Sequence, residues 1–407
     1  MRPPGRRVLY ISYDGVLEPL GESQVVAYLE RLTNCADITL LSFEKPEDLS
    51  DRPRMNVMRE RLARVGITWT PRRYHKRPAV LSTVRDIAAG CLVARGWARE
   101  QGGGVGIVHA RGYVPAVVAL YAKRTHGSRF LFDMRGFWVD EKVEAGHWPA
   151  GGLLYRTGKW CERRFFANAD AIVSLTAAGV REFPSLGRVR EGAPIAVIPT
   201  CADLDRFAPG DADPARRRAL GLDDAFVAGC VGTLSNWYLR EQTLAYLAAL
   251  SRRLPRMKAL IVTREDHDRL RADAGRAGLP ADRLVLARAG FDEMPAMIRL
   301  MDVGVFFIRA CFSKRASAAT KLAEFLGCGV PVVINDRIGD SGDLVRQAGA
   351  GIVLDEAEPT RYEAAIDALL QLLADDTTPS RCREAALQTF SLAGGVASYA
   401  ALYEQLS

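Results

Sequence analysis

The sequence lacks the features that would assign it quickly to a membrane or secreted class. No apolar run approaches the roughly 20 residues that cross a bilayer. The apolar run behind the basic start, residues 8–11, is too short for a signal peptide. The 8 cysteines are scattered without a CxxC pair, so we expect reduced thiols rather than a disulfide framework. These absences predict a cytoplasmic protein.

Metal and dinucleotide motifs are also missing. The 5 histidines form neither an HxH nor an HExxH pattern, and we expect no metal site. Asp211 and Asp213 form a D-x-D pattern, but they lie away from any predicted strand end and are interpreted as a solvated loop. The glycine-rich stretch 102–106 precedes a predicted strand rather than following one, which excludes a dinucleotide fingerprint. We expect no cofactor.

Positive charge, in contrast, is abundant and uneven. The formal net charge is +7, and residues 51–77 alone hold eight arginines and one lysine against Asp51 and Glu60, nine minus two. This basic segment is interpreted either as a solvated helix face or as a surface that meets anionic lipid headgroups. Nucleic acid is not expected as a partner, because no nucleic-acid motif accompanies the charge.

Short apolar runs alternate with helical patterns along the whole chain. Such runs predict parallel strands that are covered on both faces. A stretch rich in proline and aspartate, residues 199–214, separates two series of them. The fold class is therefore α/β, with two doubly wound domains at 1–200 and 201–388 and a helix at 389–407. The expected strands are 8–12, 38–43, 67–69, 107–109, 130–133, 171–175 and 196–198, then 227–231, 259–262, 284–286, 303–308, 330–334 and 351–354.

The loops at the carboxyl ends of these strands are the expected ligand site, because open parallel sheets bind ligands there. Two such domains that face each other would form a central cleft, and the site would be assembled from both.

The most informative stretch is 317–333. A helix is expected to begin near Ala318 with Ser317 as its N-cap. Its first turn, which includes Thr320, would favour an anion. Lys321 and Glu324 are three residues apart and share a helix face. A lysine beside phosphates and a carboxylate that accepts ribose hydroxyls would suit a nucleoside diphosphate. The alternative is an ordinary surface ion pair.

A second candidate is the loop at 231–240, which follows the first strand of the second domain. Gly232 lets backbone approach a phosphate, and Thr233 and Ser235 add hydroxyl donors. Arg240 begins the next helix and supplies a cation. The alternative is a simple strand–helix turn.

Polar residues also follow the strands of the first domain. Gly21 and Ser23 precede the first helix, and His109 closes one strand. Asp133 closes the next, with Arg135 two residues on. These side chains would suit an acceptor and the transferred sugar. For His109 a purely structural role stands as the alternative.

The stretch T-K-x-x-E-x-x-x-x-G-x-P-V-V at 320–333 is similar to the donor-nucleotide motif of GT-B glycosyltransferases of family 4 type. This resemblance implies the GT-B fold, with the C-terminal helix crossing back to the first domain. It assigns the ribose to Glu324 and the diphosphate to Lys321. The string D-G-x-x-E-P-L-G-x-S-Q at 14–24 resembles bacterial polysaccharide-type members. Two positions depart from the family pattern: Ala316 replaces a frequent glutamate, and Thr233 replaces the usual arginine.

The resemblance implies a metal-independent, retaining glycosyltransferase of polysaccharide biosynthesis. It would use a nucleotide-diphosphate sugar as donor substrate, with Lys321, Arg240 and Asp133 in catalytic roles. The acceptor would be a glycan, a lipid-linked glycan or a small molecule, and the basic segment 51–77 favours a peripheral position on the inner membrane face. Two alternatives stay open: a sugar-nucleotide 2-epimerase of the same fold, and an inactive binding module.

Overall fold

The structure, a computed structural model, describes residues 6–100 and 105–407 of the 407-residue chain. The chain divides into two compact units. Unit 1 comprises Met1–Pro199 and Leu392–Ser407, and unit 2 comprises Thr200–Ser391. The sequence predicts boundaries after residues 200 and 388. In the structure, the boundary between the units falls just before Thr200, and the chain returns to unit 1 at Leu392.

Unit 1 is built on a seven-stranded sheet with the order β3-β2-β1-β4-β5-β6-β7. All six neighbouring pairs are parallel. The residues of β1 from Val8 to Ile11 are almost fully buried, as expected for a central strand covered on both faces. The strands are β1 Arg7–Ser12, β2 Asp37–Glu44, β3 Thr68–Arg73, β4 Ile107–Arg111, β5 Arg129–Asp133, β6 Ala171–Ser174 and β7 Ile195–Val197.

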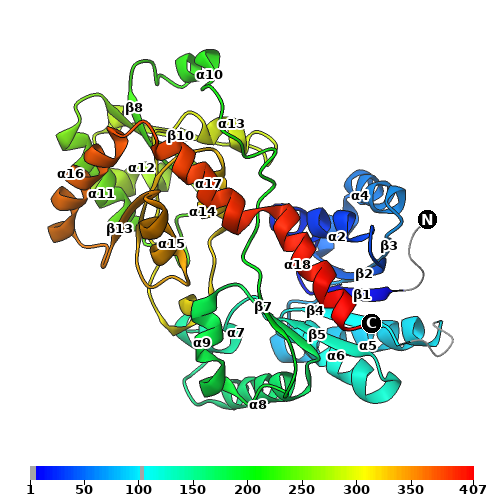
Figure 1. Ribbon diagram of the computed structural model, residues 1–407. Coiled ribbons are helices and arrows are strands. Elements are labelled where there is room, and N and C mark those ends of the chain that lie inside the picture. The colour runs from blue at the N-terminus through cyan, green and yellow to red at the C-terminus, as the bar shows by residue number, and fades with distance from the viewer. Residues whose placement is uncertain (1–5, 101–104) are drawn as a thin grey trace. The chain divides into compact units, whose positions relative to one another are not determined.

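The helices of unit 1 cover both faces of this sheet. The neighbouring helices α5 and α6 pack side by side (Figure 1). The helices are α1 Pro19–Gly21, η1 Glu22–Val26, α2 Ala27–Leu32, α3 Pro46–Ser50, α4 Arg52–Arg64, α5 Ala79–Arg99, α6 Tyr113–His126, α7 Trp138–Glu144, α8 Leu153–Asn168, α9 Ala177–Leu186 and α18 Leu392–Gln405.

Unit 2 is a second doubly wound sheet, with the order β10-β9-β8-β11-β12-β13. Its five neighbouring pairs are again parallel. Phe306 and Phe307 follow β11 and belong to separate buried clusters, because successive side chains of an extended segment point to opposite faces. The strands are β8 Phe226–Val231, β9 Met257–Val262, β10 Leu284–Ala287, β11 Val303–Val305, β12 Val332–Asn335 and β13 Gly351–Leu354.

Helices also flank the sheet of unit 2, and α14 packs against α17 (Figure 1). The helices are α10 Pro214–Ala219, α11 Arg240–Arg253, α12 His267–Arg276, η2 Ala281–Arg283, α13 Met294–Ile298, η3 Phe312–Ala316, α14 Thr320–Gly327, α15 Ser341–Ala348, η4 Pro359–Arg361, α16 Tyr362–Leu373 and α17 Thr378–Phe390.

Both strand orders reverse direction beside the first strand of the unit. The reversal lies between β1 and β4 in unit 1 and between β8 and β11 in unit 2. Loops diverge at such a switch point, and the crevice left at the carboxyl ends of the strands is where open α/β sheets bind ligands. The loop after β8 and the segment that follows β11 therefore mark the expected place for a site in unit 2.

The last helix, α18, belongs to unit 1 although it follows unit 2 in the sequence. It packs against α2, and its tyrosines reach two strands of the unit 1 sheet. Tyr399 donates a hydrogen bond of 3.0 Å to Asp133, and the Tyr403 hydroxyl is 2.7 Å from Nδ1 of His109. The two doubly wound domains and the returning C-terminal helix confirm the predicted fold class.

Three predicted boundaries are corrected by the structure. The helix expected near Ala318 begins at Thr320, and its N-cap position is Ala319 rather than Ser317. The preceding residues form the separate turn η3, which delays the helix start. The strand expected at 303–308 ends at Val305, and the strand expected from 330 begins at Val332. Among the described residues, no helix is both long and apolar enough to span a membrane.

Candidate functional site

The loop after β8 brings together several of the predicted site residues of unit 2. Gly232 has φ +78°, a left-handed conformation that favours glycine, and it turns the chain away from the strand. A side chain at this position would also point toward Nζ of Lys321, 3.9 Å from the added Cβ. Thr233 and Ser235 follow, and their hydroxyl groups lie 2.8 Å apart. The loop thus gathers backbone amides and hydroxyls at the switch point of the sheet.

The carboxylate of Glu265 holds this loop in place. One of its oxygens accepts hydrogen bonds from the amides of Leu234 and Ser235, both at 3.0 Å, and from the Ser235 hydroxyl at 2.6 Å. The Thr233 hydroxyl donates to the same oxygen. Burial alone would raise the pKa of Glu265, but these hydrogen bonds and the charge of Arg240 lower it. The donors that the sequence offers to a phosphate are therefore occupied by a carboxylate of the chain.

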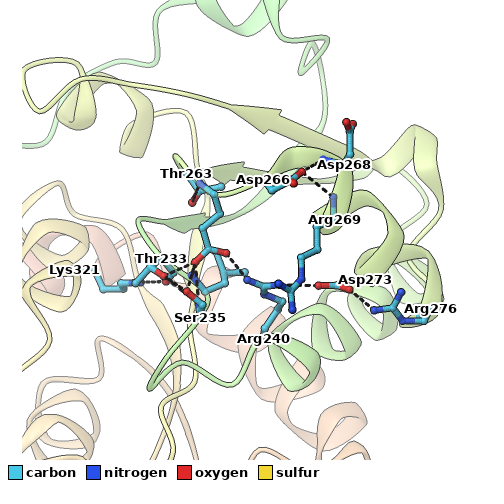
Figure 2. Close-up of polar contacts among 12 residues, drawn as sticks. Thr233, Ser235, Arg240, Thr263, Asp266, Asp268, Arg269, Asp273, Arg276 and Lys321 are labelled. Carbon is cyan, nitrogen blue, oxygen red and sulfur yellow. Dashed lines mark hydrogen bonds and ion pairs between the residues drawn. The ribbon is translucent and has the colours of Figure 1, made fainter. Parts of the chain in front are cut away.

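Arg240, predicted as a cation for the diphosphate, has a different set of partners in the structure. Its guanidinium lies 2.5 Å from Glu265 and 2.8 Å from Asp273, as Figure 2 shows for Asp273. Its side chain is mostly buried, and these two carboxylates of unit 2 balance its charge. These contacts let Arg240 orient Glu265 and the loop, and its predicted contact with a diphosphate stays a prediction.

Lys321, in contrast, has no carboxylate within ion-pair distance among the residues that the structure describes. Its Nζ donates to the carbonyl oxygen of Thr233 at 3.2 Å, and Figure 2 shows this contact. The same nitrogen lies 3.6 Å from the centre of the Tyr238 ring and 5.6 Å from that of Phe306. Burial lowers the pKa of Lys321 to about 8, because a charged ammonium is poorly solvated there. The two aromatic rings thus hold the Lys321 ammonium against the loop after β8.

Glu324 lies on the same helix, α14, one turn beyond Lys321. Its carboxylate is half-buried and forms no ion pair or hydrogen bond with the described part of the chain. Burial raises the pKa of Glu324 to about 7, although the charges of Lys321 and Arg206 act in the opposite direction. A carboxylate in this state has both oxygens available for hydroxyl donors.

The first turn of α14 lacks a side-chain cap. Thr320 is its first residue, and the Ala319 side chain cannot accept a hydrogen bond from the free amides. The helix dipole adds partial positive charge at the same end. Within unit 2 the structure therefore places Lys321 against the loop of Gly232, Thr233 and Ser235, and Thr320 precedes Lys321 in the first turn of the same helix.

The predicted residues of unit 1 form a separate buried cluster. The His109 side chain has no exposed surface, and its ring lies 4.3 Å from that of Tyr10 and 5.1 Å from that of Tyr399. Burial lowers the pKa of His109 and favours the neutral ring. Since α18 covers it, His109 contributes to the packing of that helix, and its predicted contact with an acceptor stays a prediction.

Asp133 and Arg135 lie beside His109 at the end of β5. Asp133 is also buried; burial alone would raise its pKa, but Arg135 and His109 lower it. The Arg135 guanidinium is 3.8 Å from Asp133, and its backbone has φ +55°. A non-glycine residue in this left-handed region costs of order 1–3 kcal/mol and persists where surrounding structure imposes it. The strained Arg135 is the member of this cluster whose position most suggests a ligand.

Gly21 lies in the first turn of the helical segment that begins at Pro19, and Ser23 lies in the following π-helical turn η1. Gly21 is the last residue of α1 and has ordinary right-handed helical angles. A Cβ at this position would lie 2.1 Å from the carbonyl oxygen of Gly15, so glycine is required there by packing. The Ser23 hydroxyl donates to the Leu20 carbonyl at 3.3 Å. The predicted contact of Gly21 and Ser23 with an anion or an acceptor stays a prediction.

Two glutamates with similar roles in the two units escaped the sequence prediction. Glu44 ends β2, and its carboxylate accepts from the amide of Val16 at 3.0 Å. Glu265 follows β9 and holds the loop after β8. In each unit, a glutamate at the end of the second strand thus fixes the loop after the first. Glu44 directly follows the predicted strand 38–43 and could have been found by the polar strand-end rule, whereas Glu265 lies three residues past the strand 259–262.

Matches to known families cover most of the chain. Residues 22–201 match the family described as "Glycosyl transferase 4-like domain", and residues 213–389 match the family described as "Glycosyl transferases group 1".

Curated relatives match about half of this chain. A D-inositol 3-phosphate glycosyltransferase of Geodermatophilus obscurus is 28% identical over 225 residues, 51% of this chain and 47% of that protein. One of Stackebrandtia nassauensis is 31% identical over 241 residues, 55% of this chain and 50% of that protein. The chain thus spans about half the length of the curated relatives it matches.

Solved structures extend the likeness to the whole fold. A sucrose-phosphate synthase of Thermosynechococcus elongatus has a TM-score of 0.71 at 15% identity, with 99% of each chain covered. Anabaena Alr3699/HepE in complex with UDP and glucose has a TM-score of 0.70 at 18% identity, with 98% of this chain and 100% of that chain covered. At these identities the likeness concerns the fold.

Proposed function

The chain belongs to the GT-B glycosyltransferases of family 4 type, and we propose that it transfers a sugar from a nucleoside-diphosphate donor to a hydroxyl acceptor. The observation that carries this proposal is the pairing of two groups on α14 with the loop after β8. Lys321 lies against that loop at 3.2 Å, and the half-buried Glu324 follows one turn later without an ion-pair partner in the described residues. The complex of Anabaena Alr3699/HepE with UDP and glucose supports a nucleotide sugar as donor.

The proposed reaction breaks the bond between the anomeric carbon of the sugar and the diphosphate oxygen. A bond from the acceptor oxygen to that carbon replaces it, and the acceptor proton leaves with the departing diphosphate. Negative charge grows on the leaving group, and the ammonium of Lys321 would stabilise it by preorganised electrostatics. Glu324 would accept hydrogen bonds from the ribose hydroxyls. We propose retention of the anomeric configuration and no metal ion.

The polar residues of unit 2 divide between direct and indirect roles in this proposal. Lys321 and Glu324 would touch the donor, and Thr320 with the uncapped amides of α14 would add hydrogen-bond donors. Arg240 would act through Glu265, which it contacts at 2.5 Å. Gly232 would give the phosphates access to the loop backbone, because its lack of a side chain leaves the space beside Lys321 open.

The acceptor proposal concerns a surface of unit 1. We propose a glycan, lipid-linked glycan or small-molecule acceptor, with the enzyme held at the inner membrane face through anionic lipid. The basic segment 51–77 supports this arrangement, since its net charge attracts anionic headgroups. Arg135, with its left-handed backbone, is the proposed sugar or acceptor contact of unit 1.

The first experiment is a donor screen by thermal stabilisation with UDP, GDP, TDP and CMP compounds. A ligand at a hundred times its Kd adds ~2.7 kcal/mol to stability, which such a screen detects readily. The nucleotide that stabilises the protein then defines the sugar donors for turnover assays. If no nucleotide stabilises the protein, the proposal fails.

The second experiment tests Lys321 directly. Lys321→Ala should lower turnover by roughly a hundredfold or more with the fold intact, because one preorganised charge is removed from the leaving group. Lys258→Ala is the matched control. Lys258 lies in the same unit at the start of β9, whereas the proposed site lies at the carboxyl ends of the strands. Near-normal turnover of Lys321→Ala would contradict the proposal. An isomerised donor without acceptor would instead identify an epimerase, and binding without turnover or hydrolysis would identify an inactive module.

A further inference from the structure

Helix α5 carries a row of exposed aliphatic side chains on the face turned away from the core. Val80, Leu81, Val84 and Leu92 are 51, 69, 57 and 69% exposed. At 3.6 residues per turn these four fall within one third of the helix circumference. We call this row the α5 stripe. Single exposed aliphatic residues are common on proteins, but four on one helix face form a patch that needs a partner.

The opposite side of α5 already anchors the helix to unit 1. Its buried residues are Ser82, Asp86, Gly90, Ala94 and Trp97. Gly90 packs on Val118 of α6, where an added Cβ would lie 2.9 Å from a Val118 methyl group. The Asp86 carboxylate is hydrogen-bonded to Tyr13 at 2.9 Å and lies 2.6 Å from the His75 ring. The α5 stripe is therefore additional to the face that folds the protein.

Positive charge accompanies the α5 stripe, on α5 and in the segment that leads into it. Seven cationic residues lie between residues 72 and 99, and the only acid of this stretch, Asp86, is buried. All seven are exposed, and none forms an ion pair within residues 6–100 and 105–407. Arg85, Arg95 and Arg99 project from the same side of α5 as the stripe. The seven are Arg72, Arg73, Lys76, Arg77, Arg85, Arg95 and Arg99.

The amino-terminal part of the basic segment 51–77 is less available for a partner. Arg61 contacts Glu22 at 2.5 Å and Glu30 at 2.6 Å, and Arg54 contacts Asp48 at 3.3 Å. Two of its arginines are thus balanced by acids of unit 1. Arg52, Arg59 and Arg64 are exposed and form no ion pair with the described residues. From Arg72, at the end of β3, to Arg99, at the end of α5, no lysine or arginine is paired with a described acid.

From this combination we infer that α5 and the end of β3 form a docking face for an anionic lipid surface. The aliphatic stripe would enter the interface of the bilayer, and the seven cations would contact the headgroups. A second copy of the chain fits poorly, because a symmetric contact would bring the two sets of cations together. Nucleic acid fits poorly too, since the stripe is aliphatic and offers no ring for base stacking. The inference rests on the membrane part of the proposed function, not on the transfer reaction.

The test is flotation of the full chain with two kinds of vesicle: phosphatidylcholine alone, and phosphatidylcholine mixed with phosphatidylglycerol. We expect binding to the mixed vesicles, weakened by salt. Leu81→Glu combined with Leu92→Glu should lower that binding by about tenfold or more, because both charges would have to enter the apolar region. Leu387→Glu is the matched control, an exposed leucine of unit 2 on α17.

A second variant protects the test against a folding defect. Leu92→Trp keeps the position apolar, and the fluorescence that it adds to the wild-type signal should be quenched by brominated acyl chains in the mixed vesicles. Failure of the wild-type chain to bind these vesicles, equal loss in the Leu387→Glu control, or no quenching of the added fluorescence would overturn the inference. Dimers that the double variant abolishes would do so as well. Thermal stabilisation by nucleotide, measured on the same variants, shows separately whether the donor site works.

Discussion

The ammonium nitrogen of Lys321 lies 3.6 Å from the centre of the Tyr238 ring and donates to the Thr233 carbonyl at 3.2 Å. An aromatic face attracts a cation electrostatically and replaces part of the solvation that burial removes. The lysine is therefore held at the loop before any ligand binds. Tyr238 belongs to the same loop between β8 and α11, so one segment would approach the phosphates and support the cation.

Two substitutions of Tyr238 should separate the contribution of its ring to donor binding from that of its hydroxyl group. Tyr238→Leu should weaken donor binding by about tenfold, because a cation–π contact at a desolvated site is worth ~1–2 kcal/mol. Tyr238→Phe keeps the ring and should bind the donor nearly as well as the wild type. Titration of the stabilising nucleotide by calorimetry measures both Kd values. Equal losses in the two variants would show that the ring face does not matter.

Donor binding should depend on pH with a maximum between about 7 and 8. Lys321 carries its charge below a pKa of about 8, and Glu324 is ionised above a pKa of about 7. Affinity should therefore fall as the pH rises through the first value and as it drops through the second. Titrations of the same nucleotide across this range, corrected for its own ionisation, measure the profile.

Glu324→Gln supplies the control for the acid limb. The amide cannot be protonated in this range, so affinity should be lower at neutral pH but should no longer fall below pH 7. The alkaline limb should remain, because Lys321 is unchanged. An acid limb that persists in this variant would assign the titration to another group.

Glu265→Gln should loosen the loop after β8. The neutral amide would bring its NH2 group toward the amides of Leu234 and Ser235 or accept from them without charge. Loss of such buried hydrogen bonds costs about 1–3 kcal/mol. Urea unfolding measures this loss. Asp268→Asn on α12 is the matched control, since the ion pair of the Asp268 side chain is with Arg271 of the same helix.

The pH dependence of this difference follows from the lowered pKa of Glu265. Its ionised form contributes stability above the unfolded-state pKa, and this contribution disappears as the pH falls through the lower folded-state value. The wild type and Glu265→Gln should thus converge in stability at acid pH. A constant difference over the whole pH range would show that the charge of Glu265 is not the cause.

Gly21→Ala should destabilise unit 1 rather than weaken acceptor binding alone. The added Cβ would lie 2.1 Å from the Gly15 carbonyl oxygen and 2.7 Å from Val16, so the backbone must shift, at a cost of about 1–3 kcal/mol. Gly96→Ala on α5 is the control, because its Cβ would meet no described atom within 4 Å. Thermal unfolding of both variants measures the difference. A Gly21→Ala protein with unchanged stability and impaired transfer would instead support the predicted contact of Gly21 with a ligand.

The fold could be predicted from the sequence because its strands are short apolar runs buried on both faces. The runs at 8–12 and 227–231 are strands β1 and β8 almost residue for residue. Helix starts were less accessible: η3 takes up residues that Ser317 was expected to cap. The motif of Lys321 and Glu324 was visible because both residues lie on one helix.

The partners of the site residues could not be predicted, because they are distant in the sequence. Glu265 reaches Ser235 across 30 residues, and no local pattern links the two. His109 looked available at a strand end, but Tyr403, 294 residues later, covers it. Spacing arguments find groups that share an element, whereas burial is decided by elements that arrive from elsewhere in the chain.

The return of α18 to unit 1 has a consequence for synthesis of the protein. Tyr399 and Tyr403 cover the polar groups of Asp133 and His109. Until the ribosome has added these two tyrosines, Asp133 and His109 lack the side chains that shield them from water. The first unit to be translated is therefore the last to be completed, and it must wait for the whole of unit 2. A stop codon just before Leu392 would leave unit 2 complete, but unit 1 would lack helix α18 and the side chains that it buries would be exposed.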